Sequence, residues 1–160
     1  MSKIAKYYPE IVGSLICLTL GMASGYLSHA SDSVWYAQLS KPFFNPPSWI
    51  FAPVWIILYL VIGIVGGMLW KNRVKNQKLT LLWIMQFIFN LLWSPIFFYC
   101  HSICLALIDV CFLWVSLLGL MLLALTQKPI IVLLIIPYFL WVSFAFVLNC
   151  SIYFMNISFF

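Results

Sequence analysis

Long apolar segments separated by short polar stretches dominate the chain. Segments of about 20 apolar residues can cross a bilayer as helices, and in hydrocarbon the backbone must satisfy its own hydrogen bonds. Runs such as LLIIPYFLWVSFAFVL lack the alternation of a transmembrane β-strand. The pattern therefore predicts an all-α membrane protein, a five-transmembrane-helix bundle in a single domain over residues 1–160. The predicted spans are about Pro9 to His29, Pro47 to Lys71, Lys78 to Cys100, Ile103 to Thr126, and Pro129 to Met155.

Composition and charge agree with a membrane protein. Of the 160 residues, 66% are hydrophobic and 7% are charged, against roughly 25% charged residues in a soluble domain. Seven of the eight Lys and Arg residues fall on one side of the predicted bundle: Lys3, Lys6, Lys71, Arg73, Lys75, Lys78 and Lys128. The other side carries Lys41 alone. The positive-inside rule then puts the N-terminus in the cytoplasm and the C-terminus outside, and we expect a multi-pass protein of a bacterial cell membrane.

The net charge of +5 is explained by this topology and by contact with anionic lipid. Since the chain has no soluble basic surface that would hold a duplex, we expect no nucleic acid partner.

Small residues recur four apart on the first span at Gly13, Cys17, Gly21 and Gly25. This spacing lets helix backbones approach closely, either within one subunit or between two. We favour packing within the subunit.

Polar and aromatic residues form stripes on two other spans. Gln86, Asn90, Trp93 and Phe97 fall on one helical face, which should point inward because polar groups facing lipid are costly. This face is consistent both with hydrogen bonds between helices and with a ligand cavity. A second stripe on the last span contains Tyr138, Trp141, Ala145 and Leu148, with Asn149 beside it.

Asp109 is the acidic residue that lies well inside a predicted span, and an ionisable group at that depth is a functional candidate. The alternative is a carboxyl group bonded to polar side chains of adjacent helices. The sequence has no phosphate-binding glycine loop, paired carboxylates or nucleophile with an adjacent base. Cys100-His101-x-x-Cys104 lacks the paired spacing of a zinc site, so no metal site is predicted.

The proline-rich stretch KPFFNPPSWIFAPVW precedes the second span. Pro46 and Pro47 suit an extended segment and a first helical turn, where a missing backbone donor costs little. Trp49 is then placed to anchor at the membrane interface, and Trp55 lies deeper.

Several motifs resemble those of the translocator protein family, also called tryptophan-rich sensory proteins or peripheral benzodiazepine receptors. The first part of the resemblance is Trp35-Tyr36-Ala37-x-Leu39-x-Lys41-Pro42, followed by Asn45-Pro46-Pro47-x-Trp49-x-Phe51-x-Pro53-Val54-Trp55-x-x-Leu58-Tyr59. The later matches are Gln86, Asn90, Trp93, Pro95, Phe97 and Phe98, then Ala106, Leu107 and Asp109, then Pro137-Tyr138-x-x-Trp141-x-x-Phe144 and Leu148-Asn149.

The resemblance implies five transmembrane helices, a homodimer, and binding of porphyrins such as protoporphyrin IX and haem. Sterols and benzodiazepine-type ligands would occupy the same cavity between the helices, under the first loop. No cofactor is required, and the porphyrin or haem is the ligand. The implied ligand-binding residues are Trp35, Tyr36, Trp49, Trp55, Tyr59, Asn90, Trp93, Asp109, Trp141, Ala145 and Asn149.

Three activities are compatible with this resemblance. Binding with a sensory role is preferred, because no general acid or base is evident. The alternatives are light- and oxygen-dependent degradation of the porphyrin, in which the resemblance implicates Trp55 and Trp141, and transport of a porphyrin or sterol.

Two positions depart from the family pattern. The sterol-recognition pattern needs an apolar residue, a tyrosine and then a cation; Leu148 and Tyr153 are present, but 155–160 supply no cation. High-affinity sterol binding is therefore not expected. Ala52 replaces the usual glycine before Pro53, a small change that should be tolerated.

Overall fold

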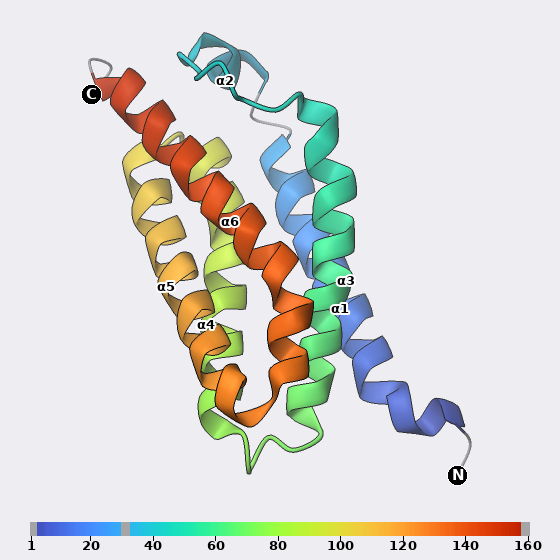
Figure 1. Ribbon diagram of the computed structural model, residues 1–160. Coiled ribbons are helices and arrows are strands. Elements are labelled where there is room, and N and C mark those ends of the chain that lie inside the picture. The colour runs from blue at the N-terminus through green and yellow to red at the C-terminus, as the bar shows by residue number, and fades with distance from the viewer. Residues whose placement is uncertain (1–2, 30–32, 158–160) are drawn as a thin grey trace.

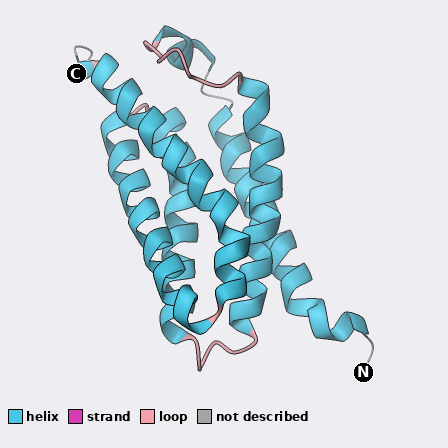
Figure 2. Ribbon diagram, viewed as in Figure 1, coloured by secondary structure: helices cyan, strands magenta, loops and turns pink. Residues whose placement is uncertain are grey.

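The computed structural model describes residues 3–29 and 33–157, which form helices and turns and contain no strand (Figure 1). Figure 2 shows short connections from α3 to α4 and from α5 to α6, whereas α2 and a longer loop lie between α1 and α3. The predicted all-α fold is confirmed. The elements are α1 (Lys3–His29), α2 (Ser33–Gln38), the 3-10 helix η1 (Ser48–Ile50), α3 (Phe51–Trp70), α4 (Gln77–Ser94), the π-helix η2 (Pro95–Tyr99), α5 (Ile103–Gln127) and α6 (Pro129–Met155).

Four helical stretches of the described chain are long and apolar enough to cross a membrane. They are Ser48–Trp70, Gln77–Tyr99, Ile103–Gln127 and Pro129–Met155, close to the last four predicted spans. Helix α1 covers the first predicted span and has 27 residues, but it is not among the four. It begins before Pro9 and contains Lys6 and Glu10, so it is less apolar than the others. The predicted count of five spanning helices is therefore not confirmed.

The long helices form two packing groups. Helix α1 packs along α3, whereas α5 packs between α4 and α6 (Figure 1). Smaller contacts of α1 with α4 and of α3 with α6 join the two groups. Figure 1 places the start of α1, the turn at 71–76 and the turn at Lys128 at one end of the bundle. Helix α2 and the end of α6 lie at the opposite end, which we call the loop end.

Glycines hold α1 and α3 at close range. A Cβ atom on Gly13 would overlap the backbone of Gly63, and a Cβ on Gly63 would overlap the backbone of Ser14. The Ser14 hydroxyl donates a hydrogen bond of 3.0 Å to the Leu60 carbonyl across the same contact. The interpretation of the small residues as packing within the subunit is confirmed for Gly13, which meets α3 here.

Helix α4 becomes a π-helix at Pro95. Because proline has no N–H, the Leu91 carbonyl has no partner four residues later in its own helix. The Ser24 hydroxyl of α1 donates a hydrogen bond of 2.7 Å to this carbonyl instead. The Cys100 N–H reaches back five residues to the Pro95 carbonyl at 3.0 Å, so the chain turns wider at the loop end.

A second hydrophobic cluster lies at the loop end, apart from the main core of the bundle. It joins the loop after α2 to η2, α5 and α6, so the loop is packed onto the helices. Its buried members are Leu39, Phe97, Ile103, Ala106, Leu148 and Ile152.

Candidate functional site

The polar stripe on α4 points inward, as predicted, because Gln86 and Asn90 are buried. The Asn90 Nδ2 donates to the Tyr138 hydroxyl at 2.9 Å, and that hydroxyl donates to the Gln86 Oε1 at 2.8 Å. The Gln86 Nε2 in turn donates to the Trp83 carbonyl at 2.9 Å. These bonds connect α4 to α6, so the first of the two interpretations of the stripe holds for Gln86 and Asn90.

Aromatic rings of α3 lie beside this network. Trp55 stacks on Tyr59 with a centroid distance of 5.4 Å and an interplanar angle of 28°. Its ring also meets Tyr138 edge-on at 6.4 Å. Tyr138 of α6 therefore contacts both Trp55 of α3 and Asn90 of α4. Together with Tyr59, these predicted residues lie in one region.

Several buried polar atoms near the loop end have no hydrogen-bond partner in the described structure. They include two acceptors on different helices, the Asn90 Oδ1 and the Asp109 Oδ2, and one donor, the Trp93 Nε1. Asn149 has neither its Oδ1 nor its Nδ2 bonded, although the side chain is only 1% exposed. Buried polar groups are nearly always paired, so these atoms have hydrogen-bonding capacity that the described side chains do not use.

The antiparallel register of the helices puts these atoms at a similar level. Phe89 of α4 stacks on Phe112 of α5 at 5.5 Å, so Trp93, four residues on, lies level with Asp109, three residues back. The Trp114 Nε1 donates to the Ser143 Oγ at 2.9 Å, which likewise brings the level of Asp109 close to that of Asn149. Donors and acceptors from three helices therefore gather in the loop-side half of the bundle.

Rings of α2 cover this end. Trp35 meets Phe97 edge-on at 5.5 Å and stacks on His101 at 4.5 Å. Tyr36 meets Phe97 edge-on at 6.1 Å, and Trp93 stacks on Phe97 at 5.1 Å. The predicted residues Trp35, Tyr36 and Trp93 are thus gathered around Phe97.

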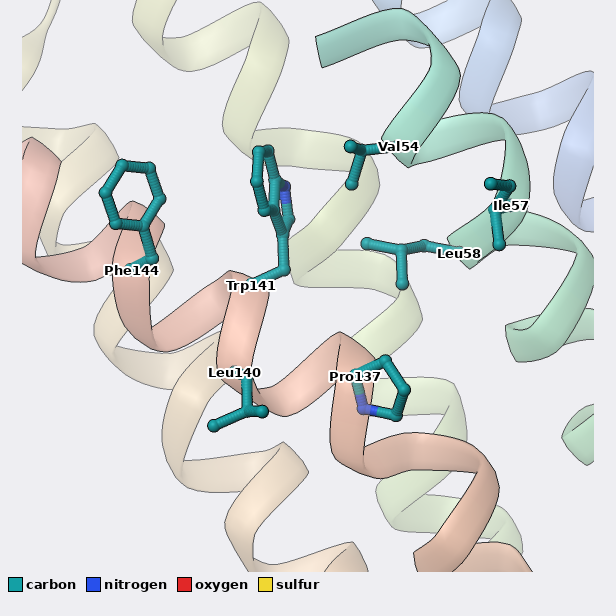
Figure 3. Close-up of a pocket in the computed structure, with 7 residues that line it drawn as sticks. All are labelled: Val54, Ile57, Leu58, Pro137, Leu140, Trp141 and Phe144. Atoms are coloured by element: carbon teal, nitrogen blue, oxygen red, sulfur yellow. The ribbon is translucent and has the colours of Figure 1, made fainter. Parts of the chain in front are cut away.

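A groove of about 370 Å³ lies between α3 and α6, and Trp141 forms part of its wall (Figure 3). Figure 3 shows Trp141 and Phe144 on α6, with Val54 and Leu58 of α3 across from Trp141. The Trp141 ring also meets Phe51 edge-on at 6.0 Å. All lining residues are apolar: Val54, Ile57, Leu58, Pro137, Leu140, Trp141 and Phe144.

The structure does not gather all predicted ligand-binding residues in one place. Trp49 is 73% exposed on η1 and belongs neither to the rings around Trp55 nor to those around Phe97. This exposure is consistent with the predicted anchor at the membrane interface. Ala145 is half-buried on α6, one turn after Trp141. No ring contact joins Trp55 to Trp141 among the described residues, although both lie where α3 meets α6.

Sequence reasoning missed His101, whose ring supports Trp35. His101 has a positive φ of 52°, an uncommon conformation for a residue with a side chain. Its Nε2 is buried and unpaired. The sequence did not predict that His101 stacks on Trp35, because this contact depends on how α2 folds back onto the helices.

Comparison with known proteins shows the family of the chain. The profile of the TspO/MBR family matches residues 13–155. A tryptophan-rich protein TspO of Archaeoglobus fulgidus is 34% identical over 149 residues, covering 92% of this chain and 97% of the relative. A tryptophan-rich protein TspO of Chlorobaculum tepidum is 39% identical over 146 residues, covering 88% and 91%. The translocator protein of Bos taurus is 35% identical over 148 residues, covering 89% and 87%. With most of its length matched, and with apolar helices able to cross a bilayer, the chain is an integral membrane protein that belongs to the TspO/MBR family.

Proposed function

We propose that this protein binds a flat, largely apolar ligand of the porphyrin class, in the space bounded by α3, α4, α5 and α6. The observation that carries the proposal is the set of unpaired polar atoms on Asn90, Trp93, Asp109 and Asn149, which lie among aromatic rings. A tetrapyrrole presents aromatic faces that stack on such rings and a polar edge that would pair with these atoms.

The groove between α3 and α6 gives such a ligand a route from the bilayer. Ile57 and Leu140 in its lining are 62% and 63% exposed, on helices that can span a membrane. A volume of about 370 Å³ is within the usual range of ligand pockets, roughly 300 to 1,000 Å³. A ligand dissolved in hydrocarbon would enter past Ile57 and Leu140 and then reach Trp141 in the groove wall.

The membrane arrangement follows the charge bias. Helix α1 acts as a fifth span because it packs along α3 for much of its length. The end of the bundle with the turns at 71–76 and Lys128 faces the cytoplasm of a bacterial cell, and the protein works as a homodimer, as the family resemblance implies.

The test is a titration of the purified protein with protoporphyrin IX, followed by porphyrin absorbance and tryptophan fluorescence, with haem and a sterol in parallel. Trp141→Phe should weaken protoporphyrin binding by about 2- to 10-fold, the value of one aromatic pair. The control is Trp70→Phe, since Trp70 is half-exposed at the other end of α3. Equal affinity in all three proteins would refute the proposed site.

A second function, photo-oxidative degradation of the bound porphyrin with dioxygen as the oxidant, is favoured by two ring contacts of Trp55. Trp55 is stacked on Tyr59 and touches Tyr138, so an oxidisable indole lies in a continuous group of rings. Illumination in oxygen should give a defined absorbing product in the wild type but not in Trp55→Phe/Trp141→Phe. Loss of porphyrin at the same rate in both proteins, without such a product, would show ordinary bleaching.

A further inference from the structure

Asn156, the residue after α6, bonds to a distant part of the chain. Its Oδ1 accepts from the Ser40 N–H at 3.0 Å, and its Nδ2 donates to the Ser40 carbonyl at 2.9 Å. The same Nδ2 donates to the Ile152 carbonyl at 2.7 Å. The side chain is 0% exposed. One asparagine thus satisfies both backbone groups of Ser40 and fixes them to its own helix.

These two hydrogen bonds join residues that are 116 positions apart in the chain. Leu39 is buried beside Ile152 in the second hydrophobic cluster, directly before Ser40. Asn156 itself is fully buried and uses both its donor and its acceptor group. An apolar residue at this position would therefore lose both bonds to Ser40 and the bond to Ile152 at once.

The loop segment 39–47 carries α2 at one end and continues into η1 and α3 at the other. The segment is continuous with α2, whose Trp35 contacts Phe97 and His101. Phe97 in turn stacks on Trp93. Figure 1 shows α2 and the end of α6 at the same end of the bundle, and Asn156 directly follows α6 in the chain. Releasing Ser40 would leave α2 held to α4–α6 by ring contacts and by Leu39.

We propose that Asn156 is a positioning residue that latches segment 39–47 onto the end of α6, keeps α2 over the candidate site and so limits how fast a ligand leaves. The effect on ligand rests on the proposed function, whereas the latch itself does not.

The first experiment measures the latch without ligand, by amide hydrogen exchange on the full-length protein in detergent. In Asn156→Leu, peptides covering 33–45 should exchange about tenfold faster or more, equivalent to the loss of one or two net hydrogen bonds. Peptides from the middle of α5 should be unchanged. The control is Asn76→Ala, which removes another buried asparagine at the opposite end of the bundle and should leave 33–45 protected.

Asn156→Asp provides a second variant if Asn156→Leu does not fold. It keeps the acceptor for the Ser40 N–H but turns the two donor bonds into repulsion between oxygens, so it should also speed exchange of 33–45 selectively. Unchanged exchange in this segment, or an equal rise across all helices, would overturn the latch.

The second experiment measures dissociation of protoporphyrin IX by stopped flow. Asn156→Leu should release it about tenfold faster, with the same quenching at saturation as the wild type, because Trp141 is untouched. If the wild type binds no porphyrin, the proposed function fails while the exchange result still decides the latch. If porphyrin binds and leaves both proteins at the same rate, the latch does not control the site.

Discussion

At the scale of single residues, Gly63 shows how a missing side chain fixes two helices. A Cβ atom there would overlap backbone atoms of Gly13 and Ser14, which cannot move without shifting all of α1. Gly25 of α1 belongs to the same four-residue spacing as Gly13, yet a Cβ atom added to it would meet nothing within 4 Å. The two glycines therefore form a matched pair.

Gly63→Ala should lower the free energy of unfolding by about 1 to 3 kcal/mol, the usual cost of overpacking a close contact. Gly25→Ala should be neutral, or stabilising by up to about 1 kcal/mol through helix propensity. Thermal unfolding in detergent measures both, and equal destabilisation by the two variants would contradict the packing described here.

At the candidate site, the sequence predicted which way two side chains face, but it did not predict contacts between distant segments. Inward-facing Gln86 and Asn90 followed from helical spacing, because a polar group facing lipid is unfavourable. The spacing did not predict that Gly13 contacts another helix and Gly25 does not, because this contact depends on which helix lies opposite. The support of Trp35 by His101 and the bonds of Asn156 to Ser40 also went unpredicted, because these contacts join segments far apart in the chain.

At the scale of elements, the connection between α4 and α6 depends on one phenol. The Tyr138 hydroxyl both accepts from Asn90 and donates to Gln86, and all three side chains are buried. Removing this hydroxyl would leave the Asn90 Nδ2 and the Gln86 Oε1 without their shared partner.

Tyr138→Phe should therefore lower the free energy of unfolding by about 1 to 3 kcal/mol for each group left unpaired. The control is Tyr26→Phe, because Tyr26 is 79% exposed on α1. Denaturant unfolding followed by circular dichroism would measure the difference, and a Tyr138→Phe variant as stable as Tyr26→Phe would show that the hydroxyl contributes nothing.

Helix positions were predictable where apolar runs were long. The last predicted span, Pro129 to Met155, coincides with α6. The short helix α2 was missed because six residues carry too little periodicity. The π-helix at Pro95 was missed because a proline signals a break but not the wider turn that follows. The status of α1 as a span stays a prediction, since Lys6 and Glu10 make its first half less apolar.

At the scale of the whole molecule, the bundle consists of two parts with different contacts. Helices α1 and α3 meet backbone to backbone at Gly13 and Gly63, and Lys71 pairs with Glu10 at 2.5 Å beside that contact. Helices α4, α5 and α6 pack through side chains, as in the contact of Trp114 with Ser143. Composition predicted the membrane bundle as a whole, but it could not predict this division, which depends on the pairing of helices.

The turn at 71–76 joins the two parts, and residues 71–75 are exposed. Covalent continuity there contributes little to either part, because transmembrane helices can insert first and associate afterwards. Two separately expressed chains, 1–73 and 74–160, should therefore find each other in the membrane and copurify. Breaking the chain after Gly119 would instead divide α5 within its own group and should abolish copurification. Copurification would show that the contacts between helices, and not the turn at 71–76, hold the two parts of the bundle together.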